Sequence, residues 1–380
     1  MKLRIGLIEV GPAWLTRHRP ALRTLRERFD VRAVCCGVSK KAEPIAAEFQ
    51  ADVVEGYRAM VSRADIDAVM ILERSWHGWL PVLAACDAGK AVYWAGDLQF
   101  DPVADAEVYR RVDESGIAFM AELPRRFAPA TLRLKELIAT KLGAPRLVFC
   151  HRRLPVVPSR PGGICDSDPL AESRRELVEL IDWCRYVVAR EPSSVTALIH
   201  HQPFAPFPNT AGPNASAPNA SLSTPAAMPP QPDGDGPQAS DPAARPDYQC
   251  LSLRFAAQGS APEVMCQLSC GQYIPAAWNE AIGFRPPSAM QICCEHGLAF
   301  IDLPTNLVWF DEAGRHLESL DTELSVGDQM LTQFHRVVTS LVRRRNDLDD
   351  AFRAASVLAA ADQSDQERRQ VDLDELLGPG

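Results

Sequence analysis

The fold of this chain is indicated by its first fourteen residues, MKLRIGLIEVGPAW (residues 1–14). Residues 2–8 are a short and mostly apolar run, with the length and composition of a buried parallel strand. Gly11 and Pro12 interrupt this run, and apolar residues then recur at helical spacing from Leu15 to Phe29. A strand that leads directly into a helix is the first half of a dinucleotide-binding unit.

The turn between this strand and helix departs from the usual G-x-G-x-x-G fingerprint of such units. Its three glycine places hold Glu9, Gly11 and Trp14. Glu9 adds a carboxylate where the helix N-terminus would attract a pyrophosphate, and Trp14 adds an indole where a glycine lets helix and strand approach closely. Only Gly11 is left to let the backbone approach a phosphate.

Strands and helices alternate along the first third of the chain. Strand candidates are residues 2–8, 31–38, 66–72, 92–94 and 117–120, and helices are expected at 42–49, before Gly89, and at 102–115. This alternation predicts βαβ units and a parallel sheet, in an α/β fold with helices on both faces of the sheet. We therefore predict an N-terminal Rossmann-like, doubly wound domain over residues 1–122.

The following part has a different pattern. A helix over 128–142 leads to strand candidates without regular helices between them, at 146–152, 194–200, 248–255, 263–269, 290–294, 298–301 and 307–310. The runs 248–255 and 263–269 flank Gly259-Ser260 and predict a hairpin, and helices over 326–343 and 348–361 follow. We predict an α+β domain with a mostly antiparallel sheet over residues 123–370. Its open face is the expected surface of a homo-oligomer.

Residues 203–247 interrupt this second domain. They are rich in Pro, Ala, Asn, Ser and Gly and have almost no apolar periodicity. Such a segment cannot bury enough apolar surface to fold, so it is predicted to be a disordered insertion.

Composition excludes several classes of function for this 380-residue chain. The net charge of −9 argues against a nucleic-acid partner. No apolar run is long enough to cross a membrane, and no signal peptide is recognised at the start, so a cytoplasmic protein is expected. The 11 cysteines form no C-x-x-C pair, so no metal site is predicted.

Several motifs resemble the Gfo/Idh/MocA family of NAD(P)-dependent oxidoreductases. After the initial strand, turn and helix they are AGKAV (88–92) and RRFAP (125–129). In the last part of the chain they are EHG (295–297), the run from there to Trp309, and DAFRA (350–354). The resemblance implies the two-domain fold predicted above, an NAD or NADP cofactor, and a sugar or polyol substrate.

The resemblance also points to contacts with the cofactor. Family members usually place an acid at the end of the second strand to bind the adenosine ribose, but this chain has Cys36 there, with Ser39 and Lys40 just beyond. A hydroxyl and cations without an acid suit a 2′-phosphate, which favours NADP over NAD. The alternative is that Lys40 is a solvated charge at a helix start.

Further cofactor contacts are expected at the carboxyl edge of the sheet, where ligands of such sheets bind. Trp76 lies in the sequence WHGW (76–79), directly after the third strand. Aromatic rings there are predicted to stack on a base or sugar, with Trp76 as the candidate contact, and the alternative is that at least one of Trp76, His77 and Trp79 packs beneath the cleft. Gly11 and Pro12 are the predicted contacts in the turn.

The family's catalytic lysine lies in a Glu-Lys-Pro motif after the fourth strand. Through the AGKAV match this motif aligns with Ala95-Gly96-Asp97, so Gly96 replaces the lysine. Glycine has no side chain that could move the proton accompanying hydride transfer. Asp97 is the candidate acid or base, and the alternative is an aspartate that caps a turn or helix.

The family's substrate helix carries D-x-G-x-H-x-x-D, which aligns best with residues 175–182. Glu179 takes the place of the histidine, and Asp182 keeps the final acid. Residues three apart share one side of a helix, so these two acids are predicted to act together, with one pKa raised. The alternative is that both acids face solvent.

Arg125 and Arg126 are candidates for holding an anionic ligand between the domains, with surface arginines as the alternative. Two hypotheses about function follow. The chain is a divergent oxidoreductase with Asp97, Glu179 and Asp182 as catalytic groups, or it is a non-catalytic pseudoenzyme whose cleft or sheet face holds a small molecule or a partner.

Overall fold

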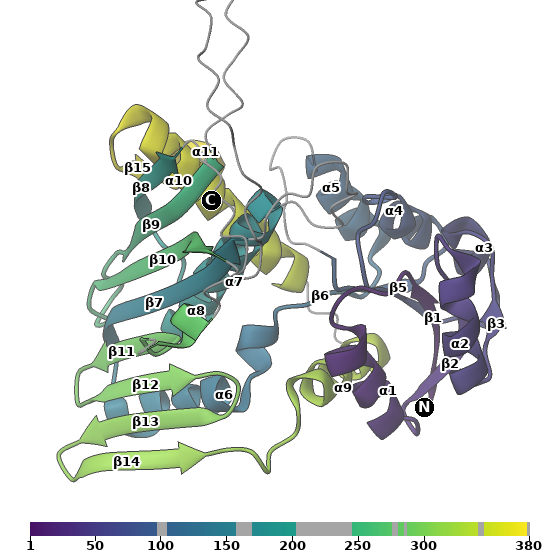
Figure 1. Cartoon of the computed structure of the whole chain (residues 1–380), viewed down its shortest axis with the longest axis horizontal. Coiled ribbons are helices and arrows are strands. Elements are labelled where there is room, and N and C mark those ends of the chain that lie inside the picture. Colours follow the sequence, from purple (N-terminus) through teal and green to yellow (C-terminus); the bar gives the residue numbers. More distant parts are fainter. Residues whose placement is uncertain are drawn as a thin grey trace, which may run out of the picture.

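The N-terminal part folds around a parallel sheet. The computed structural model describes residues 1–96, 105–156, 169–202, 245–275, 280–284, 287–340 and 346–377. Its first sheet has the order β3-β2-β1-β4-β5-β6, with every neighbouring pair parallel (Figure 1). The strands are β1 (Leu3–Ile8), β2 (Phe29–Cys35), β3 (Asp52–Val53), β4 (Ala68–Ile71), β5 (Ala91–Trp94) and β6 (Phe119–Ala121). This is the doubly wound order, so the predicted Rossmann-like fold is confirmed.

Helices cover both faces of this sheet. They are η1, a π-helix (Trp14–His18), α1 (Arg19–Thr24), α2 (Ser39–Phe49), α3 (Tyr57–Val61), α4 (Leu80–Asp87) and α5 (Ala106–Ser115). The central strands β4 and β5 are buried at every position, as expected for a parallel sheet between two helical layers. The two-residue strand β3 is too short to leave a pattern in the sequence.

The second sheet has nine strands in the order β14-β13-β12-β11-β7-β10-β9-β8-β15. Neighbouring strands are antiparallel except β10 and β7, which are parallel. Its strands are β7 (Pro145–Val156), β8 (Ser194–Gln202), β9 (Arg245–Phe255), β10 (Val264–Pro275), β11 (Met290–Cys294), β12 (Leu298–Asp302), β13 (Asn306–Asp311), β14 (Gly314–Ser319) and β15 (Val371–Asp372). The predicted mostly antiparallel sheet and its β9–β10 hairpin are confirmed.

The remaining helices are η2, a 3₁₀ helix (Pro124–Phe127), α6 (Pro129–Leu137), η3, a π-helix (Ile138–Leu142), α7 (Pro169–Val188), α8 (Glu280–Gly283), α9 (Val326–Thr339), α10 (Asn346–Glu367) and α11 (Asp374–Leu377). The long helix α7 separates β7 from β8, so the expectation of strands without regular helices between them is wrong there. Its apolar residues Leu177, Leu180 and Ile181 are buried in a cluster shared with the sheet, which gives the helix a surface to pack on.

The chain returns to the first sheet near its end. Helix α9 lies beside α1 in Figure 1, and its residues Met330, Leu331 and Phe334 belong to the same buried cluster as Leu3 and Ile5 of β1. Ser325 caps this helix by accepting a hydrogen bond from the N–H of Asp328. The core of the N-terminal sheet is therefore completed by residues far along the chain.

Most of the predicted insertion at 203–247 lies outside the described residues, and its last three positions belong to β9. No helix in the described part of the chain is long and apolar enough to cross a membrane.

Candidate functional site between the two domains

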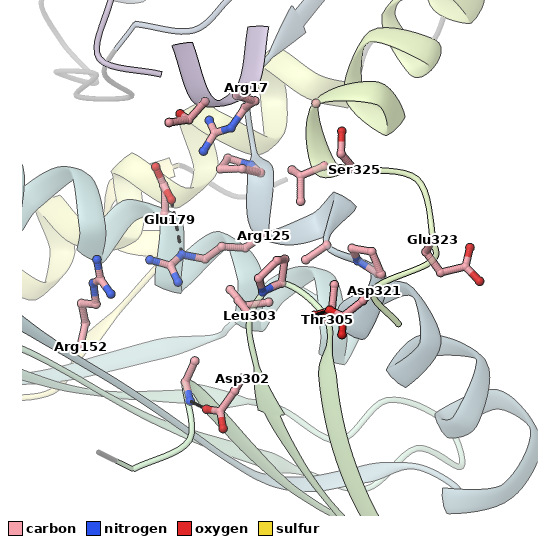
Figure 2. A pocket seen from close by; sticks show the side chains of 18 of the residues that line it. Arg17, Arg125, Arg152, Glu179, Asp302, Leu303, Thr305, Asp321, Glu323 and Ser325 are labelled. Carbon is pink, nitrogen blue, oxygen red and sulfur yellow. Dashed lines mark hydrogen bonds and ion pairs between the residues drawn. The ribbon is translucent and has the colours of Figure 1, made fainter. Parts of the chain in front are cut away.

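A cavity of about 900 Å³ lies between the two domains (Figure 2). Its lining comes from several regions of the chain, among them Thr16 and Arg17 of η1, Pro124 and Arg125 of η2, residues 151–153 of β7, Glu176 and Glu179 of α7, and the segments 302–305 and 323–327. This volume is in the range of small-molecule sites, and a boundary between domains is a usual place for one.

Arg125 and Arg126 of η2 form buried ion pairs with acids of α7. Arg125 pairs with Glu176 and has Nε 3.4 Å from Glu179 Oε2, and Arg126 pairs with Asp182. Burial works against the charge of Arg125, but Glu176 and Glu179 overcome it and raise its pKa. The side chains of Arg125 and Arg126 are only 13% and 11% exposed, so the alternative that these are surface arginines is wrong.

Glu179 and Asp182 are both buried, at 9% and 1% exposed, so the alternative of solvent-facing acids is wrong as well. Glu179 lines the cavity, and Figure 2 shows it between Arg17 and Arg125. Asp182 is held by Arg126 and by Arg185, whose Nη1 lies 3.3 Å from its Oδ1. Burial raises the pKa of Asp182, while the two arginines act to lower it.

A second buried network shares Arg17 with the cavity wall and centres on Glu122, directly after β6. Arg17 pairs with Glu122 Oε1, His18 Nε2 lies 2.6 Å from Oε2, and the Tyr93 hydroxyl donates to Oε2 at 3.0 Å. Burial and the Arg17 cation lower the pKa of His18 to about 3, so His18 is neutral and donates through Nε2. The network fixes Arg17 in the cavity wall.

The structure shows why the altered turn folds. A Cβ on Gly11 would lie 2.6 Å from the carbonyl oxygen of Leu72 at the end of β4, so this position needs glycine for packing alone. Trp14 is 8% exposed and packs in the core, with its ring 6.2 Å from that of Phe49. The indole therefore fills space between the turn and α2.

Glu9, at the first glycine place, adopts φ 54°, a conformation that glycine adopts more readily. Its backbone N–H donates to the carbonyl of Cys35 at 2.8 Å, and its Oε1 accepts a hydrogen bond from the N–H of Gly37 at 2.8 Å. His77 Nε2 lies 3.5 Å from the same oxygen. The Glu9 carboxylate therefore lies at the carboxyl end of β2 and not over the turn.

The other predicted cofactor residues lie on the surface near the carboxyl ends of the strands of the first sheet. Pro12, Ser39 and Lys40 are exposed, and Ser39 and Lys40 begin α2. Trp76 is 79% exposed, and its ring lies 3.8 Å from that of His77. Trp79, by contrast, is 7% exposed and stacks on Trp94 at 4.2 Å, so the alternative that at least one of these aromatic residues packs inward is confirmed, while Trp76 itself stays exposed.

Asp97, the predicted acid or base after the fourth strand, lies outside the described residues. Gly96 is described, and a Cβ there would lie 2.6 Å from the indole of Trp94, which is fully buried. The indole of Trp94 therefore occupies the space in which a lysine side chain at residue 96 would begin.

Arg17 and His151 are two of the cavity residues that sequence reasoning missed. Arg17 reaches the wall one helical turn after Trp14, and His151 of β7 hydrogen-bonds through Nδ1 to Ser269 Oγ at 2.6 Å. Burial and Arg153 lower the pKa of His151. The position of Arg17 just after the fingerprint was a usable signal, but no motif marks His151, because its partner is 118 residues away.

Comparisons with known proteins agree with this fold. No family model matches the chain. Dehydrogenase aclE of Aspergillus oryzae is 28% identical over 146 residues, which is 36% of this chain and 40% of the length of that relative. Among solved structures, a levoglucosan dehydrogenase in complex with NADH and levoglucosan aligns at a TM-score of 0.71 and 16% identity, covering 98% of this chain and all of the other.

Two further structures give the same result. UDP-N-acetylglucosamine 3-dehydrogenase GnnA from Acidithiobacillus ferrooxidans aligns at a TM-score of 0.66 and 16% identity, over 96% of each chain. An oxidoreductase from Thermotoga maritima aligns at 0.68 and 16% identity, over 99% of this chain and all of the other. The chain therefore has the two-domain fold of Gfo/Idh/MocA-type oxidoreductases, and the resemblance is confirmed at the level of the fold.

Proposed function

We propose that this protein is an NAD(P)-dependent oxidoreductase that binds a sugar- or polyol-type substrate in the interdomain cavity. The observation that carries the proposal is the cavity itself, because its wall places Glu179 between the guanidinium groups of Arg17 and Arg125. Carboxylate acceptors beside guanidinium donors suit a ligand with several hydroxyl groups, since each hydroxyl both donates and accepts.

The sheet edge offers a fitting place for the dinucleotide. The crevice in a sheet of this order lies at the carboxyl ends of β1 and β4, where Gly11 and Trp76 are found. Trp14 does not compete for this place, because its ring is buried in the core. When bound, the nicotinamide supplies the acceptor or donor of hydride.

Glu179 is the proposed acid–base group. It holds the place of the family's histidine and lines the cavity. Its carboxylate can therefore take the proton of a substrate hydroxyl while the carbon that bears this hydroxyl gives up its hydride. Arg125 and Arg175, each within 3.4 Å of one of its oxygens, orient the carboxylate. Asp182 lies on the same helix as Glu179, and its ion pair with Arg126 ties this helix to η2. Asp97 stays a prediction for the same proton transfer.

The proposal is tested by binding and then by turnover. NAD(H) and NADP(H) are titrated by calorimetry, and a panel of sugars and polyols is then assayed at 340 nm, the absorbance of reduced nicotinamide. We expect saturable dinucleotide binding, and a fall in kcat of about 100-fold in Glu179→Gln without loss of dinucleotide binding. Glu136→Gln, an exposed acid on α6, is the matched control.

A second candidate function is that of a non-catalytic binding protein. Gly96 favours it, because Trp94 uses the space in which the family's catalytic lysine would begin. Dinucleotide binding with no turnover on any substrate of the panel would support this candidate. The absence of dinucleotide binding at millimolar concentration would exclude the oxidoreductase. We also propose that the open face of the second sheet joins copies of the chain.

A further inference from the structure

Three strand ends meet at the carboxyl edge of the first sheet. Glu9 follows β1, Gly37 follows β2, and Trp76 with His77 follows β4, and these strands are adjacent in the order β2-β1-β4. Glu9 Oε1 bonds the N–H of Gly37 at 2.8 Å, and a Cβ on Gly37 would lie 3.8 Å from the indole nitrogen of Trp76. The structure thus builds one small polar and aromatic site from three separate turns.

The conformation of Glu9 directs its side chain to this site. Its φ of 54° turns the chain at the end of β1, and its N–H is tied to the Cys35 carbonyl of β2 at 2.8 Å. Glu9 is only 8% exposed, so its carboxylate is held in a fixed place. Its contacts with Gly37 and His77 both use Oε1, which leaves Oε2 able to accept another hydrogen bond.

In doubly wound nucleotide-binding domains, an acid at the end of the second strand accepts hydrogen bonds from the adenosine ribose, and its charge disfavours a 2′-phosphate. The second strand of this chain ends without an acid. The first strand supplies one instead, since the Glu9 carboxylate lies on the N–H of Gly37. The cations near this point are on the exposed start of α2, whereas the carboxylate is at the sheet edge.

We propose that Glu9 is the ribose-recognition residue of the dinucleotide site, that it selects NAD(H) over NADP(H), and that Trp76 stacks on the adenine. This inference rests on the proposed dinucleotide binding. It reverses the preference for NADP expected from Ser39 and Lys40, because a fixed carboxylate repels a 2′-phosphate and accepts a hydrogen bond from a 2′-hydroxyl.

The test is a titration of NADH and, separately, of NADPH into the full chain. Binding is monitored by the quenching of tryptophan fluorescence and by calorimetry. We expect the wild-type protein to bind NADH at least about tenfold more tightly than NADPH. In Glu9→Gln the amide oxygen still accepts from Gly37, so the turn is kept while the charge is lost. The preference should then fall by about tenfold, mainly through tighter NADPH binding.

Glu43→Gln is the matched control, because it removes one negative charge from the exposed side of α2 and should leave the preference unchanged. Trp76→Ala should weaken both dinucleotides by about tenfold and leave their ratio unchanged. A competition assay needs no variant: AMP should displace NADH from the wild-type protein, and adenosine 2′,5′-bisphosphate should not.

Three results would overturn the inference while dinucleotide binding stands: tighter binding of NADPH by the wild-type protein, an unchanged ratio in Glu9→Gln, or displacement by the bisphosphate as efficient as by AMP. If neither dinucleotide binds, the proposed function fails and the inference fails with it. The two failures are therefore distinguished in one titration series.

Discussion

At the scale of single residues, the packing around Gly96 gives a structural reason for the absence of the family's catalytic lysine at this position. A Cβ at this position would lie 2.6 Å from Trp94 Cζ2, and Trp94 is 0% exposed and stacked on Trp79. A buried and stacked indole cannot move aside easily, because protein interiors are packed to crystal-like density. The glycine in place of the lysine and the buried Trp94 are therefore linked, because the indole packs where a side chain at residue 96 would begin.

We expect Gly96→Ala to lower the free energy of unfolding by about 1–3 kcal/mol, since the added methyl overpacks the Trp94 site. The measurement is urea denaturation followed by tryptophan fluorescence. The control is Gly283→Ala in α8, where a Cβ meets nothing within 4 Å. Equal stability of the two variants would show that Trp94 adjusts without cost.

At the scale of elements, ion pairs tie the 3₁₀ helix η2 to α7 and α10. Arg126 pairs with Asp182 of α7 and, at 2.6 Å, with Asp350 of α10. Arg185 of α7 reaches the same two acids. Because Asp182 is 1% exposed, removing a cation leaves a buried charge only partly compensated.

Arg126→Met should therefore lower the free energy of unfolding by about 3 kcal/mol. Replacing Asp182 by Asn in the same protein should restore part of this loss, because the uncompensated charge is then gone. Chemical denaturation of the single and double variants measures both effects. Arg110→Met on α5, whose side chain is 53% exposed between Glu107 and Glu114, is the control and should cost less than about 1 kcal/mol.

A double variant as unstable as the sum of its two single variants would contradict this account, since it would mean that Arg126 and Asp182 act independently.

At the scale of the whole molecule, the second sheet leaves large apolar side chains uncovered. Leu198 of β8 is 64% exposed and Met265 of β10 is 49% exposed, while their chain neighbours Ala197 and Cys266 are buried. This alternation is that of a sheet with one face packed on helices and the other free. Exposed apolar surface of this kind is typical of a protein interface.

We expect the wild-type chain to be larger than a monomer in light scattering after size exclusion. Leu198→Lys combined with Met265→Lys should yield the monomer, because burying two uncompensated charges in an interface is unfavourable. The control is Leu15→Lys, which changes an equally exposed leucine (66%) on the N-terminal domain. A monomeric wild-type protein would exclude the proposed interface.

The sequence determined the class of fold because its strands and helices are recorded in local patterns. The apolar run at residues 2–8, the helix that ends just before Gly89, and the hairpin around Gly259 each depend on a few neighbouring residues, and the structure contains all of them. Short strands such as β3 and β15 were missed, because two residues form no period.

The site depended on tertiary structure, because its side chains come from turns that only the crossovers of the fold bring together. From the sequence, Glu9 was expected to repel the pyrophosphate, and the end of β2 lacked an acid. The parallel pairing of β1 with β2 joins these two observations, since it places the Glu9 carboxylate on Gly37, 28 residues further along the chain. Local patterns determine which elements form, whereas the chemistry of a site depends on which strand ends become neighbours.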